Sequence, residues 1–224
     1  GGGGPRRCLP QHPRDQVVTL IYAGHETTAA TLALASYELA RRPAVRARFH
    51  REVDGLDGTP GPADLASLPV TERIVTETLR LYPPVYVIPR ESRRRVTVDG
   101  YRLPSGVPVW LGIRQIHRDD RFYDRPTAFR PSRWNGSLRE SIPDFAYAPF
   151  GGGPRLCIGR QFALLETKLV LATIGRRFAF STTPPATEAE ATPAEAAAER
   201  TDEAGSDAPS SDPPLTADMT LRLT

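Results

Sequence analysis

The chain has 224 residues, of which 29 are Lys or Arg and 26 are Asp or Glu, and its formal net charge is +3. This length is sufficient for one domain with a substantial core. Residues 181–224 hold nine acidic and two basic side chains, so residues 1–180 carry 27 basic and 17 acidic ones. Because the basic residues form no nucleic-acid-binding motif, we expect an acidic protein partner, or simply solvated arginines, and no nucleic acid.

The cysteine content indicates a reducing compartment. The two cysteines, Cys8 and Cys157, form no spacing pattern typical of a disulfide framework, and we expect a cytoplasmic protein. No signal peptide is recognisable. The sequence begins with four glycines instead of a methionine, and we interpret it as a fragment of a longer protein or an incomplete gene model.

A long helix is the first regular element that the sequence predicts. Residues 1–15 are rich in Gly, Pro and Arg and are expected to form a loop or frayed leader. The helix should run from about residue 16 to 42 and end at Pro43. Its apolar residues lie nearly all round, so we expect it to be buried through the middle of the domain. A membrane span is the alternative, but His25 and Glu26 interrupt the apolar run, and we expect no span in this chain.

The centre of this helix has an unusual composition. It reads Ala23-Gly24-His25-Glu26-Thr27-Thr28. Gly and consecutive Thr are unfavourable inside a helix, and a Thr hydroxyl can bond back to the preceding turn and bend it. Gly24 would let a flat ligand or dioxygen approach the backbone, and Glu26 beside Thr27 could relay protons in a buried groove. The alternative is a kinked core helix whose threonine is satisfied by its own backbone.

Two further helices are predicted downstream. A short amphipathic helix should cover residues 44–54, and a second helix should cover 69–81, where the following prolines end it. Within the second, Glu77 and Arg80 are three residues apart and can pair on one helix face. Taken alone, this pair could be an ordinary surface ion pair that contributes little.

Extended structure follows the second helix. Val85-Tyr86-Val87-Ile88 is an apolar extended run, and residues 96–103 predict a hairpin with a type I′ turn at Asp99-Gly100. A strand is expected over 107–113, and together these strands would make one small sheet. Residues 120–149 are rich in Pro and aromatic side chains and predict an ordered coil with short turns.

A glycine-rich stretch, Phe150–Gly159, carries the second cysteine. It reads Phe-Gly-Gly-Gly-Pro-Arg-Leu-Cys-Ile-Gly, which excludes a helix or regular strand and predicts a tight loop. The loop brings Cys157 to the start of an apolar helix expected over about 158–177. The helix N-terminus and Arg155 favour a thiolate. One thiolate is too few ligands for a structural zinc site but suffices for haem iron; the alternative is a glycine-rich turn before a helix, with a buried cysteine.

The end of the sequence changes character. Residues 178–180 suggest a strand. Residues 181–213 hold no large apolar residue and are expected to be a disordered acidic insert. A terminal strand is expected within 214–224.

Four motifs together resemble the cytochrome P450 family. Phe150–Gly159 resembles its haem-binding cysteine loop at every specified position, and residues 23–28 resemble its oxygen-activation segment. Residues 77–80 resemble its Glu-x-x-Arg motif, and residues 129–134 resemble the later stretch that supplies a third partner, here Arg133. The motifs occur in the family's order, which makes the joint match more specific than any single one.

The resemblance covers about residues 16–180 and departs from the family pattern in places. Ser132 stands where the usual form has Glu, and Trp134 stands where it has Phe. Residues 116–119 resemble the family's His/Asn-Arg-Asp segment. The resemblance implies a mainly α fold with a minor β-sheet, of which this chain would be the C-terminal portion only.

The resemblance also implies an activity. It implies a monooxygenase that inserts one atom of O2 into an apolar organic substrate, with electrons from a ferredoxin or flavodoxin-like partner. The implied cofactor is haem b, iron protoporphyrin IX, with Cys157 as the metal ligand. Two alternatives stay open: a non-catalytic P450 fragment that binds haem poorly alone, and a haem-thiolate enzyme that uses peroxide.

Roles for individual residues follow from the same resemblance. Thr27 and Glu26 would handle dioxygen and protons, and Glu77, Arg80 and Arg133 would hold the cysteine loop. The implied cofactor-binding residues besides Cys157 are Gly24, Arg90, Phe150, Gly151, Gly153, Arg155 and Gly159. The implied substrate-pocket residues are Ala23, Val85, Tyr86, Val87 and Ile88.

Overall fold

The computed structural model describes residues 13–182 and 219–223, and in this part the chain is mainly α-helical with small antiparallel sheets. The helices are α1 (Pro13–Arg41), α2 (Pro43–Asp54), α3 (Pro69–Leu81), α4 (Ile113–His117), α5 (Leu138–Ser141) and α6 (Arg160–Gly175). The strands are β1 (Val87–Glu91), β2 (Val96–Val98), β3 (Tyr101–Leu103), β4 (Pro108–Gly112), β5 (Phe178–Thr182) and β6 (Met219–Leu223). Short 3-10 helices cover Pro62–Ser67, Pro131–Asn135 and Gly153–Arg155.

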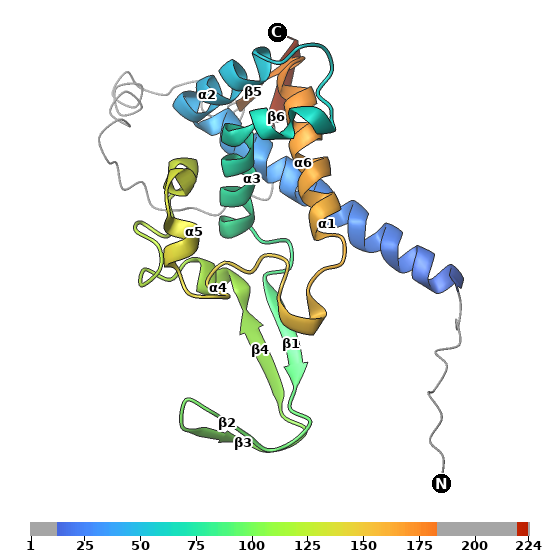
Figure 1. Cartoon of the computed structure of the whole chain (residues 1–224), viewed down its shortest axis with the longest axis vertical. Coiled ribbons are helices and arrows are strands. Elements are labelled where there is room, and N and C mark those ends of the chain that lie inside the picture. The colour runs from blue at the N-terminus through green and yellow to red at the C-terminus, as the bar shows by residue number, and fades with distance from the viewer. Residues whose placement is uncertain (1–12, 183–218, 224) are drawn as a thin grey trace, which may run out of the picture.

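The core lies where α1, α2, α3 and α6 meet beside β5 (Figure 1). The helices predicted over 44–54 and 69–81 are confirmed, the latter at both ends. Each of these elements contributes fully buried apolar side chains to one cluster, and those that anchor it are Leu39, Phe49, Val53, Ile74, Val75, Leu171 and Phe180. The four helices therefore share one apolar core, from which the segments that follow α3 extend.

Helix α1 differs from its prediction in extent and in burial. It begins at Pro13, three residues early, because proline suits the first helical turn and Asp15 suits its positive end. Residues 35–40 are buried, but the apolar side chains of the N-terminal half are more than half exposed, namely those of Val17, Val18, Leu20, Ile21 and Tyr22. Burial along the whole helix was thus a wrong prediction, and this half projects from the body in Figure 1. None of the helices in the described ranges has the length and apolarity needed to cross a bilayer.

The strands after α3 form two separate sheets. The hairpin prediction is confirmed: β2 pairs with β3, and Asp99 and Gly100 both have positive φ, as a type I′ turn requires. The prediction of a single sheet is wrong, because β4 pairs with β1 instead. Ser92 N donates to Val107 O (3.1 Å) and Gly106 N donates to Ser92 O (2.7 Å), which continues the β1–β4 ladder and leaves the hairpin at its end (Figure 1).

The remaining segments position the cysteine loop. Between α4 and the loop the chain is an ordered coil with short helical turns, as predicted. β5 extends two residues into the stretch 181–213 for which disorder was expected, and it pairs with β6. Residues 183–213 of that stretch and residues 1–12 of the expected leader lie outside the described residues.

A glutamate from α2 caps the N-terminus of α3. No side chain at the start of α3 makes a capping hydrogen bond. Instead the Glu52 carboxylate accepts hydrogen bonds from Val70 N (2.5 Å), Thr71 N (2.7 Å) and Thr71 Oγ1 (2.7 Å). These bonds satisfy amide groups that the helix itself leaves unpaired and place a negative charge at its positive end. Glu52 therefore stabilises the helix that carries Glu77 and Arg80.

Removing this cap should destabilise the fold. Glu52→Ala leaves Val70 N and Thr71 N without their acceptor and should lower the free energy of unfolding by about 1–2 kcal/mol. Glu52→Gln keeps one acceptor oxygen and should cost less. Urea unfolding measures both, with Asp54→Ala, an exposed change on the same helix, as the control. Equal losses for Glu52→Ala and Asp54→Ala would contradict the cap.

Candidate functional site

A cavity of about 1290 Å³ lies between α1, the start of β1, the cysteine loop and the start of α6. From α1 it is lined by three predicted site residues, Ala23, Gly24 and Thr27. From the segment after α3 it is lined by Val85, Ile88 and Arg90. From the loop it is lined by Phe150, Gly151, Arg155, Cys157 and Gly159. The fold therefore brings together residues more than 130 positions apart in the sequence.

Of the residues predicted to contact dioxygen, the cofactor or the substrate, four do not line this cavity. Glu26 is exposed although its neighbour Thr27 faces inward, because adjacent helix positions point in different directions. Tyr86 is exposed and Val87 is half-buried, since the extended run turns only part of its side chains toward the cavity. Gly153 lies in the 3-10 turn before Cys157. It helps to set the course of the loop backbone but does not form part of the cavity wall.

The cysteine loop is held by its own backbone. Cys157 N donates to Phe150 O (3.0 Å), and Leu156 N donates to Gly153 O (3.0 Å). Gly151 and Gly153 have φ of 70° and 64°, a region that side chains with a Cβ rarely adopt. A Cβ on Gly152, the middle glycine, would lie 2.2 Å from Phe145 Cε1, so the Phe145 ring would have to move to make room for a larger residue. The loop thus presents Cys157 as an exposed, free thiol at the cavity.

These residues fit a flat metal-bearing cofactor. Among the described residues no group of three or more His, Cys, Asp or Glu side chains could hold a metal ion by itself. A metal at Cys157 would therefore need most of its ligands from a group such as a porphyrin. The loop offers one thiol beside glycine backbone, and the arginines Arg90 and Arg155 line the same cavity as cations for carboxylates.

Thr27 makes the back-bond that its position in a helix allows. Its Oγ1 donates to Ala23 O (2.8 Å), and Thr31 Oγ1 donates to Thr27 O (2.9 Å). The hydroxyl oxygen of Thr27 keeps its acceptor capacity toward the cavity that it lines. Thr27 can therefore donate a hydrogen bond to its own helix and still accept one from a molecule in the cavity.

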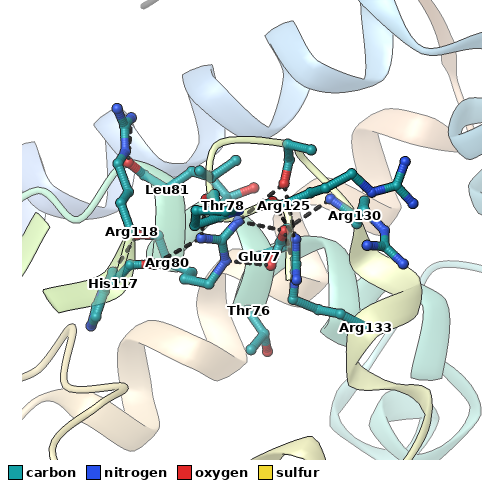
Figure 2. A network of polar contacts seen from close by, with 12 residues as sticks. Thr76, Glu77, Thr78, Arg80, Leu81, His117, Arg118, Arg125, Arg130 and Arg133 are labelled. Atoms are coloured by element: carbon teal, nitrogen blue, oxygen red, sulfur yellow. Dashed lines mark hydrogen bonds and ion pairs between the residues drawn. The ribbon is translucent and has the colours of Figure 1, made fainter. Parts of the chain in front are cut away.

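In the C-terminal half of α3, Glu77 is the centre of a buried network (Figure 2). Its Oε1 accepts from Arg80 Nη2 (2.8 Å), Arg133 Nε (2.9 Å) and Arg130 N (2.8 Å). Its Oε2 accepts from Arg80 Nε (2.9 Å) and Trp134 Nε1 (2.8 Å). Both Glu77 and Arg80 are fully buried, so this pair is not the surface ion pair that the sequence alone allowed.

The charge on Glu77 is stabilised by its partners. Burial by itself would raise the pKa of the carboxyl, but the hydrogen bonds and charges of Arg80 and Arg133 outweigh burial and hold the pKa below its usual value. Arg80 also donates to the backbone oxygens of His117 (2.8 Å), Pro126 (2.5 Å) and Ala128 (3.1 Å). The network therefore fixes irregular backbone between α4 and the 3-10 helix at Pro131–Asn135.

Sequence reasoning missed two members of this region. Trp134, which departs from the usual family residue, supplies an indole N–H to Glu77 that a phenylalanine could not. His117 is fully buried, with Nδ1 3.1 Å from Arg80 O and Nε2 accepting from Ala148 N (2.9 Å). Two features of the sequence could have indicated these roles. Trp134 departs from the usual family residue, and His117 lies in the segment that resembles the family's His/Asn-Arg-Asp.

Neutralising Glu77 should be strongly destabilising. Glu77→Gln leaves the buried guanidinium of Arg80 and that of Arg133 without their counter-charge and should lower the free energy of unfolding by about 3–5 kcal/mol. Glu72→Gln on the same helix is the matched control, because Glu72 is largely exposed and lies 3.7 Å from Lys168 Nζ. It should cost less than about 1 kcal/mol. Similar urea midpoints for both variants would contradict the central role of Glu77.

Acidification should weaken the fold through His117. Burial lowers the pKa of His117 from 6.5 to about 4, and the nearby cations Arg80 and Arg139 act in the same direction. Between these values the unfolded chain binds a proton that the folded chain does not, so stability is complete above pH 6.5 and falls by roughly 3 kcal/mol as the pH drops toward 4. His117→Asn should lack this part of the pH dependence of urea unfolding. If the free energy of unfolding varied with pH in the same way in both proteins, His117 would not be the source of this pH dependence.

Comparison with known proteins assigns the chain to a family. The cytochrome P450 family model matches residues 4–198. Cyclooctatin synthase of Streptomyces melanosporofaciens is 39% identical over 170 residues, which cover 75% of this chain and 37% of that protein. Lithocholate 6-beta-hydroxylase of Mesocricetus auratus is 35% identical over 170 residues (75% and 34%). Pentalenene oxygenase of Streptomyces avermitilis is 40% identical over 162 residues (71% and 36%).

The chain spans about a third of the length of these curated relatives. The family match extends over most of the chain and includes the cavity, the cysteine loop and the buried network. On this sequence match, together with the mainly helical fold, the chain belongs to the cytochrome P450 family.

Proposed function

We propose that the protein containing this chain is a haem-thiolate monooxygenase that inserts one atom of O2 into an organic substrate. The observation that carries the proposal is the exposed Cys157 thiol at a cavity that Thr27 also lines. Relatives named as an oxygenase and a hydroxylase support the same reaction class. The peroxide-using alternative needs no alcohol to handle dioxygen, so the presence of Thr27 in the cavity favours O2.

The proposed cofactor is haem b, whose iron Cys157 would hold through its sulfur. When bound, haem iron with thiolate ligation supplies the chemistry of O–O bond cleavage. Arg90 and Arg155 would pair with its propionates, because a carboxylate removed from water requires a cation that can donate two hydrogen bonds. Gly24 and the loop residues Phe150, Gly151, Gly153 and Gly159 would leave room for the flat ring.

Thr27 is the residue that we propose to hold a water molecule, because water can donate a hydrogen bond to its Oγ1. Its side chain lines the cavity and remains able to accept a hydrogen bond while donating to Ala23 O. Glu26 stays a predicted proton donor, and its exposed position supports this role less than that of Thr27. Glu77, Arg80 and Arg133 would act at a distance, by fixing the backbone between α4 and the 3-10 helix at Pro131–Asn135.

The substrate that we propose is a small apolar molecule. Apolar side chains from three segments line the cavity, among them Leu20, Val85, Ile88 and Phe162. The relatives' names refer to different molecules and therefore select no single substrate. The excess of basic residues before position 181 supports an acidic ferredoxin or flavodoxin-like electron donor. Cysteine content remains the basis for a cytoplasmic location.

We propose that the chain by itself binds haem more weakly than a full-length member of the family. The apolar side chains of Leu20 and Tyr22 line the cavity yet are more than half exposed, so they leave it open to water. An open cavity supplies less apolar contact to a bound ring. The alternative of a non-catalytic fragment thus applies to the isolated chain and not to the family assignment.

The absorption spectrum of the reduced, carbon-monoxide-bound protein tests the proposal. After reconstitution with haem, the protein should show the red-shifted Soret band typical of thiolate ligation. Cys157→Ser should abolish this band, because the thiolate is its source. Cys8→Ser is the matched control and should retain it. A thiolate-type band in Cys157→Ser would contradict the assignment of Cys157 as the ligand.

A further inference from the structure

Three side chains hold the segment that leads into the cysteine loop. Tyr123 Oη donates to Ala146 O (2.8 Å), and Tyr147 Oη donates to Thr76 O (3.0 Å). Ala148 N donates to His117 Nε2 (2.9 Å). The last bond lies closest in sequence to Phe150, the first residue of the loop.

His117 connects this segment to α3, because one ring nitrogen binds the segment and the other binds α3. Because an amide N–H can only donate, Nε2 must accept from Ala148, and the proton of the neutral imidazole is therefore assigned to Nδ1. Nδ1 then donates to Arg80 O at 3.1 Å. Arg80 Nη1 in turn donates to His117 O (2.8 Å), so the two residues bind each other reciprocally.

The ring has no freedom to turn in this position. It is fully buried and stacks on Tyr147, with ring centroids 5.3 Å apart and an angle of 18° between the planes. The cations Arg80 and Arg139 lie nearby and oppose a positive charge on the ring. A doubly protonated ring would also direct an N–H at the Ala148 N–H. The site is therefore specific for a neutral side chain with an acceptor at the Nε2 position.

Backbone hydrogen bonds carry this attachment from Ala148 to Cys157. Gly151 N donates to Ala148 O (3.0 Å), which closes the turn around Phe150. Cys157 N donates to Phe150 O (3.0 Å). A shift of Ala148 would therefore move the carbonyl to which Cys157 is bound.

We propose that His117 is a positioning residue of the cysteine loop, which ties Ala148 to Arg80 and so sets where Phe150 and Cys157 lie. This inference rests on the proposed function only in taking Cys157 as the cofactor ligand. It assigns to His117 a role that the motif residues Glu77, Arg80 and Arg133 do not perform, since none of them donates to or accepts from residues 146–157 in a described hydrogen bond.

Two substitutions separate the two bonds of the ring. In His117→Asn the amide nitrogen can still donate to Arg80 O, but the side chain is too short to reach Ala148 N. In His117→Gln the longer side chain places its oxygen where Nε2 stood and can accept from Ala148 N. The family segment that this stretch resembles takes either His or Asn at this position, so His117→Asn is expected to fold.

Hydrogen exchange of the Ala148 amide, measured without haem, is the primary readout. His117→Asn should exchange at least about tenfold faster than the unsubstituted protein, and His117→Gln should restore most of the protection. Amides of α2 serve as the internal reference for global stability. Equal acceleration of the α2 amides, or equal exchange in the Asn and Gln variants, would overturn the proposal.

The unsubstituted protein provides a test that needs no variant to fold. The ring nitrogen chemical shifts of His117 should identify the neutral tautomer with its proton on Nδ1, and a proton on Nε2 would overturn the proposal. In the haem-loaded protein, His117→Asn should lose more of the thiolate-type Soret band than His117→Gln does. If exchange responds as expected but Cys157→Ser keeps that band, the haem-ligand assignment fails and the positioning role of His117 stands.

Discussion

A carboxylate without access to water stays ionised only if enough donors surround it, and Glu77 receives five hydrogen bonds from α3 and residues 130–134. The buried guanidinium of Arg80 also needs hydrogen-bond partners, and it donates to three backbone oxygens besides the Glu77 carboxylate. Residues 117–134 contain little regular structure of their own. Their position is therefore set by the need to satisfy two buried charges, and not by a ladder of backbone hydrogen bonds.

Helix α3 and the side chains bonded to it connect this network to the wall of the cavity that the cysteine loop forms. Glu52 fixes the N-terminus of α3, and the buried pair lies near its C-terminus. His117, Tyr123 and Tyr147 then attach the segment before the cysteine loop. Side chains that do not line the cavity thereby support the segment that presents Cys157, and such support is what its proposed role as a metal ligand would require.

The two walls of the cavity differ in support. Both walls carry exposed apolar side chains, such as Ile158 and Phe162 on one and Leu20 on the other, but the loop is also held by its own backbone hydrogen bonds and by a leading segment that is bonded to His117 and α3. Thr27 lies where the exposed half of α1 gives way to the buried half. On the cysteine side, hydrogen bonds to other segments of this chain hold the residues that we propose to bind the cofactor. On the α1 side, the corresponding residues lie on a half of the helix that is largely exposed.

The sequence by itself determined the local features: the limits of α3 between its prolines, the type I′ turn at Asp99-Gly100, and a glycine loop that presents a cysteine before a helix. These follow from proline, glycine and side-chain periodicity within a few residues. Only the tertiary structure decided that Glu77 and Arg80 are buried, that β4 pairs with β1, and that half of α1 is exposed. Helical spacing fixes which side chains share a face but not what covers that face. For Trp134 and His117 the covering partners lie 57 and 31–37 residues away, and their choice depends on how the whole chain packs.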